Sequence, residues 1–96
     1  MISAIGNNVS QNHQALKYGR TGIGKSKFLD SRYADNLLFG EVNLSNQELR
    51  NQIRLADSKG ISRTGLLAIN AWKEAVLDSR LTQSQIKDFG TAFLSA

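Results

Sequence analysis

Apolar residues that recur at helical spacing give the strongest structural signal in the chain. The longest pattern predicts a helix at 62–79. One broad arc of this helix is apolar and consists of Ala68, Ile69, Ala71, Trp72, Ala75 and Val76. Leu66, Leu67 and Leu77 lie outside that arc, so most of the circumference is apolar. We expect such a helix to be covered on several sides, which a 96-residue chain can hardly achieve alone.

Helix start signals locate three further helices. Ser45 with Glu48, and Thr82 with Gln85, have the spacing of capping boxes, in which the two side chains bind backbone N–H groups at the helix start. Asn8 offers a similar cap to an earlier helix. The helices predicted from these three starts are 9–18, 46–57 and 83–88.

Short apolar runs predict three strands, at 2–5, 37–42 and 91–95. The glycine-rich and polar region 19–36 is expected to be a loop. The fold class predicted is therefore α/β, with three short strands and about four helices. The chain begins in one expected strand and ends in another, as a fragment of a larger sheet would.

Composition and charge exclude several kinds of site. The chain has no Cys, which excludes disulfides, thiolate metal sites and a cysteine nucleophile. With His13 as its single histidine, it offers no convincing catalytic triad. No apolar run approaches the ~20 residues of a membrane helix, and residues 1–6 are unlike a signal peptide. We therefore expect a cytoplasmic protein without a membrane partner.

The net charge of +4 leaves two interpretations open. The lysines and arginines either form an ordinary solvated surface or attract an acidic partner. Nucleic acid is not favoured as that partner, because no basic strand rich in aromatic residues is present. A small module that binds an acidic partner is thus one candidate function.

The segment Gly19–Ser26 matches the phosphate-binding string G-x-x-x-x-G-K-S. A working P-loop lies between a buried strand and a helix that points its N-terminus at phosphate. Here the preceding residues are expected to be helical, and the following residues have no apolar helical stripe. We therefore expect a glycine-rich connection, with a P-loop nucleotide binder as the alternative.

Six segments in order resemble the N-terminal part of the β-ketoacyl-[acyl carrier protein] synthases, which are condensing enzymes of the thiolase superfamily. The first reads Ile-Ser-Ala-Ile-Gly-Asn-Asn-Val and resembles the segment after the family's first strand. Residues 62–64 and 75–79 together form a second piece and resemble the start and end of the family's buried helix. The remaining matched segments are Ala15–Ile23, Phe28–Asp30, Phe39–Val42 and Phe89–Ala96.

This resemblance implies a partial N-terminal synthase domain over residues 1–96, in a thiolase-like αβαβα fold with its first strand truncated. The family condenses acyl and malonyl thioesters in a decarboxylative Claisen reaction, in fatty acid or polyketide-type biosynthesis. Its catalytic cysteine and histidines lie beyond the matched region. We therefore expect no catalytic residue, cofactor or metal in this chain, which could also be part of a non-catalytic partner subunit.

The resemblance also implies partners. The parent enzyme is expected to be a homodimer that receives the acidic acyl carrier protein on a basic patch before the buried helix. The residues implied for this patch are Arg54, Lys59 and Arg63, of which Lys59 aligns most directly. The alternative for these residues is an ordinary solvated helix end.

Overall fold

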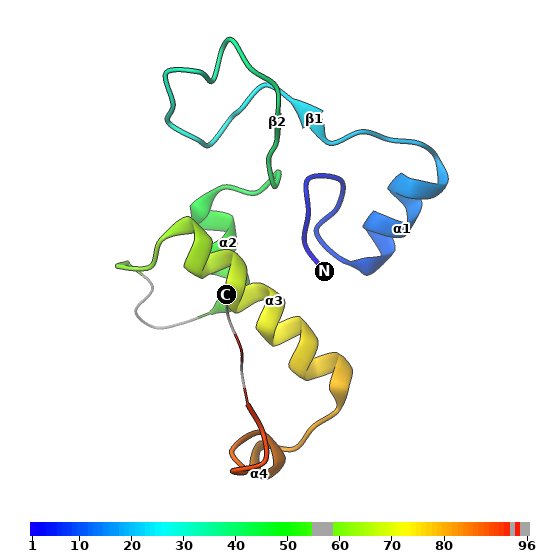
Figure 1. The fold of residues 1–96 in the computed structure, drawn as a ribbon, viewed down its shortest axis with the longest axis vertical. Coiled ribbons are helices and arrows are strands. Elements are labelled where there is room, and N and C mark those ends of the chain that lie inside the picture. The colour runs from blue at the N-terminus through cyan, green and yellow to red at the C-terminus, as the bar shows by residue number, and fades with distance from the viewer. Residues whose placement is uncertain (55–58, 93, 95–96) are drawn as a thin grey trace.

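The computed structural model describes residues 1–54, 59–92 and 94. The elements in chain order are α1 (Val9–Lys17), β1 (Ile23–Gly24), β2 (Phe39–Gly40), α2 (Asn46–Ile53), α3 (Arg63–Ser79) and α4 (Gln83–Ile86). As expected, the chain mixes helix with strand, and its described part contains four helices and one two-stranded sheet. Figure 1 shows α2 and α3 side by side, with the β1–β2 hairpin above them and α1 to one side.

The predicted helix starts are confirmed. Asn8, Ser45, Ser62 and Thr82 are all N-caps whose side chains accept from a backbone N–H three residues on. Ser45 and Thr82 form complete capping boxes, which satisfy N–H groups that a helix start otherwise leaves without partners.

Three helix ends differ from the prediction, and the smallest difference is that α1 ends at Lys17, one residue before the predicted 18. α2 ends at Ile53, and Arg54 follows it as a C-cap in the left-handed conformation, with φ of 50°. Residues 55–57 of the predicted helix lie outside the described residues. α4 ends at Ile86, before the predicted 88, and Lys87 is its C-cap.

The predicted strand at 2–5 is wrong. These residues form a tight turn, in which the N–H groups of Ser3 and Gly6 each donate to the other residue's carbonyl. The turn is held by Asn12 of α1, whose side chain is only 2% exposed. Its amide donates to the carbonyls of Met1, Gly6 and Asn8, and its carbonyl accepts from the Ser3 hydroxyl. A buried polar residue of the helix that follows thus holds this apolar run in a turn.

The other two predicted strands need correction as well. Of the run 37–42, Phe39–Gly40 forms the strand β2. Its antiparallel partner is β1, which the sequence placed in a loop. Thr91, Ala92 and Leu94 are not in a strand, and residues 93 and 95 lie outside the described residues. Both strands have only two residues, which is too short for an alternating pattern to show in the sequence.

The core is small and lies between α2 and α3. Its buried apolar residues are Leu44, Leu49, Ile53 and Leu66. Leu44 and Leu49 flank the Ser45 cap at the spacing of a hydrophobic staple. On α3 the fully buried residue is Leu66. It lies outside the predicted apolar arc and is buried because α2 covers that side of the helix.

Much of the predicted apolar arc of α3 remains open. Ala68, Ala71 and Ala75 are exposed, and Trp72 is 41% exposed. The molecule measures 48 × 36 × 25 Å, with a radius of gyration of 15.7 Å. A compact domain of this length would have a radius of about 12.5 Å. The chain is therefore extended, and its one small core leaves apolar faces uncovered.

Candidate functional site

The glycine-rich segment and the β1–β2 hairpin surround an open hollow of about 350 Å³. Its polar lining includes Thr21, Lys25, Lys27, Glu41 and Asn43. The Lys27 ammonium donates to the side-chain carbonyl of Asn43 at 3.5 Å. Because this hollow contains the segment that matches the phosphate-binding string, it is the first place to test for an anion site.

The backbone donors beside this hollow already hold a carboxylate. Glu41 accepts from the N–H of Lys27 at 2.7 Å, from the N–H of Phe28 at 3.2 Å and from the Ser26 hydroxyl at 3.2 Å. Slight burial raises the pKa of Glu41, but these hydrogen bonds and the Arg63 charge outweigh it and hold the pKa below its ordinary value of 4.5. The anion that this loop binds is therefore part of the chain itself.

The glycines of the segment serve the backbone. Gly19 has φ of 64° and follows α1, as a glycine after a helix C-terminus commonly does. A Cβ on Gly22 would lie 2.4 Å from the carbonyl oxygen of Ala4, so this position lets the hairpin approach the N-terminal turn. β1 lies within the segment, and no helix follows Ser26 directly. A P-loop arrangement is thus not formed, which agrees with the expected glycine-rich connection.

Arg63 is one of the three residues implied in carrier-protein binding, but its guanidinium binds groups of this chain. Its guanidinium donates to the carbonyl of Val42 at 2.8 Å, to the carbonyl of Leu44 at 2.8 Å and to the Asn46 side chain at 3.0 Å. It also lies 5.3 Å from the centre of the Phe28 ring. Arg63 therefore fastens the start of α3 to the connection between β2 and α2.

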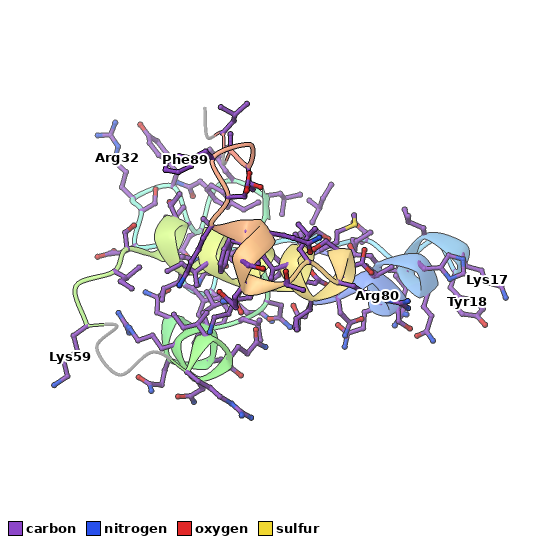
Figure 2. All side chains as sticks on the ribbon, turned by 90° about the horizontal axis from the view of Figure 1, so that it is seen from below. Lys17, Tyr18, Arg32, Lys59, Arg80 and Phe89 are labelled. Carbon is purple, nitrogen blue, oxygen red and sulfur yellow. The ribbon has the colours of Figure 1, made fainter. Side chains whose placement is uncertain are left out.

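Arg54 and Lys59 differ from Arg63 because both are exposed. Figure 2 shows the Lys59 side chain extending away from the body of the molecule. Their positive charges are accessible to an acidic partner, whereas the donors of Arg63 are turned toward the backbone. Of the three predicted site residues, Arg54 and Lys59 are thus the two whose side chains are exposed.

The described residues contain no group of three or more His, Cys, Asp or Glu that could hold a metal ion. His13 is exposed on α1. Glu74 pairs with the N-terminal ammonium of Met1.

The sequence did not reveal the roles of Asn12 and Glu41. The available signal for Asn12 was its position three residues before Ala15, on the face that α1 buries. Glu41 gave no comparable signal, because its donors lie 13 to 15 residues away along the chain.

Comparisons with protein-family models, with curated proteins and with solved structures gave no match to this chain. Among the described residues, no helix combines the length and the apolar character that crossing a membrane requires.

Proposed function

We propose that the chain is a non-catalytic part of a condensing enzyme of the β-ketoacyl-[acyl carrier protein] synthase type. Other parts of that enzyme would complete the thiolase-like fold and supply the cysteine and histidines of the Claisen condensation. The proposal rests first on the six segments that resemble the family in order along the chain. It implies a cytoplasmic homodimer as the whole enzyme.

The open side of α3 is the structural observation that supports this proposal most. By resemblance, α3 corresponds to the family's buried helix. In the chain alone, Ala68 and Trp72 of this helix are exposed, and Leu77 is 80% exposed. A helix with this composition is normally covered on several sides, so further protein would have to pack against it. A larger enzyme body would provide that cover.

Within such an enzyme, the exposed Arg54 and Lys59 would meet the acidic carrier protein. Exposed charges at the edge of an interface mainly accelerate encounter and are screened by salt. Arg63 would act differently, because its donors hold the start of α3 in place. Arg54 and Lys59 are therefore the residues of this chain that we propose to contact the carrier protein.

The test is a titration of the ¹⁵N-labelled chain with acyl carrier protein at low salt, followed by NMR. We expect shifts of the Arg54 and Lys59 amides that disappear in the double variant Arg54→Glu/Lys59→Glu. Arg63 is left unchanged, so that the start of α3 stays intact. Lys87→Glu, an exposed change at the end of α4, is the matched control and should bind as the wild type does.

Two results would contradict the proposal. One is the absence of any shift at low salt. The other is an equal response to an unrelated acidic protein of similar charge, which would favour the simpler function of a basic module with acidic partners.

A further inference from the structure

A second open site lies between α3 and the N-terminal residues. It is a groove of about 330 Å³ whose apolar lining consists of Met1, Val9, Ala71 and Ala75. Glu74 and Asp78 of α3 line it as well, so the groove combines an apolar surface with an acidic edge. Glu74 is already paired with the N-terminal ammonium, whereas Asp78 is exposed. An occupant that fits would offer apolar side chains next to a positive charge.

We propose that this groove binds the α1 helix of a second copy of the chain. The exposed side of α1 carries Val9 and Leu16, seven residues apart and therefore on one helix face. Their side chains are 62% and 69% exposed. Lys17 and Arg20, also exposed, follow directly at the end of this helix. Figure 2 shows Lys17 extending away from the body of the molecule.

The charge pattern favours the chain itself as the occupant. The whole chain is basic, with a net charge of +4, yet the edge of this groove is acidic. The basic end of one α1 is therefore complementary to Asp78 of another copy. Since Val9 belongs both to the groove and to the docking face, the two surfaces adjoin. Two copies related by a two-fold axis could each place α1 in the groove of the other, as a self-complementary dimer requires.

The chain as a whole exposes more surface than a compact monomer of its mass would. The chain exposes 7730 Å², whereas a compact monomer of its mass would expose about 5,500 Å². A specific interface of ordinary size covers about 800 Å² on each partner. The excess, summed over the whole molecule, is therefore larger than one such interface. This inference concerns the chain by itself and does not depend on the proposed condensing-enzyme function.

The first test is sedimentation velocity over a concentration series. We expect a reversible dimer in the wild type and association weakened by about tenfold or more in Ala71→Glu/Ala75→Glu. Both positions are exposed on a helix that tolerates glutamate, and circular dichroism verifies that the helix is kept. The double variant Asn51→Glu/Gln52→Glu adds the same charge on the exposed side of α2 and should associate as the wild type does.

The second test uses charge exchange and is insensitive to general damage to the fold. Lys17→Glu and Asp78→Lys should each weaken the dimer, and the two changes combined should restore it. A wild-type chain that stays monomeric at its highest soluble concentration would overturn the proposal and leave the groove to a different partner. A dimer that is unaffected by Ala71→Glu/Ala75→Glu, or a charge exchange without recovery, would overturn it too.

Discussion

The side chain of Asn12 joins the first helix to the N-terminal turn that precedes it. Its amide joins the carbonyls of Met1, Gly6 and Asn8, all of which precede it in the chain. The apolar run 2–5 would otherwise suit a strand. Because the turn leaves these carbonyls partly buried, the Asn12 amide provides hydrogen bonds that water does not fully supply.

Replacing Asn12 by alanine should therefore loosen the N-terminal turn. We expect the free energy of unfolding to fall by about 2 kcal/mol, since removing the Asn12 amide leaves several polar groups unsatisfied. Hydrogen exchange of the Ser3 and Gly6 amides measures this directly, because these two amides close the turn. Gln14→Ala, at an exposed position of the same helix, is the control and should change their protection little. Unchanged protection in Asn12→Ala would show that the turn forms without this side chain.

Glu41 gives the chain a defined dependence on pH. Its pKa in the folded chain lies below the ordinary value of 4.5, so the ionised carboxylate stabilises the loop at neutral pH. This stabilisation is fully present above pH 4.5 and is lost as the pH falls through the lowered pKa. The amide shifts of Lys27 and Phe28 should report this titration in NMR, with a midpoint below 4.5. In Glu41→Gln the same amides should show no such transition, whereas a midpoint at 4.5 or above in the wild type would contradict the account.

Among the elements, α3 and the β2–α2 connection depend on each other through Arg63. One guanidinium group reaches two backbone carbonyls, those of Val42 and Leu44, and the Asn46 side chain. A lysine has the same charge but a single ammonium group, which does not reproduce the fixed fork of donors. The position of the connection thus depends on the shape of the arginine side chain as well as its charge.

Arg63→Lys should consequently lower the free energy of unfolding by about 2 kcal/mol, the order expected for hydrogen bonds that involve a charged group. Urea denaturation followed by circular dichroism at 222 nm measures the effect. Arg80→Lys, an exposed change at the C-cap of α3, is the matched control and should be nearly neutral. Equal stability of the two variants would show that the contacts of Arg63 add little.

The helices were predictable from the sequence, and the strands were not. The starts of α2 and α4 follow from local capping chemistry at Ser45 and Thr82, which acts over three residues. In contrast, β1 and β2 pair across 15 residues or more. The contact of Glu41 with Lys27 spans the hairpin loop, and the contact of Arg63 with Val42 spans α2. Such contacts depend on how the chain folds back, which a pattern along the sequence does not contain. The predicted role of Arg63 in carrier-protein binding missed its backbone contacts for the same reason.

For the molecule as a whole, we predict that the chain alone does not catalyse the condensation. It has no cysteine to accept an acyl group, and His13 is its single histidine. Without a cysteine, the chain has no thiolate to hold the acyl group next to the malonyl group, as the proposed condensation requires. Incubation of the purified chain with acyl and malonyl carrier proteins should yield no β-ketoacyl product by mass spectrometry. A product that survives removal of host synthases from the preparation would contradict this expectation.

As a whole, the chain does not fold into a compact unit of its own and leaves apolar faces for other protein to cover. Small-angle X-ray scattering, extrapolated to low concentration, tests this claim most directly. We expect a radius of gyration near 15.7 Å in the dilute limit, which grows as the concentration rises and copies associate. A radius of about 12.5 Å, the value for a compact domain of this length, at every concentration would contradict it.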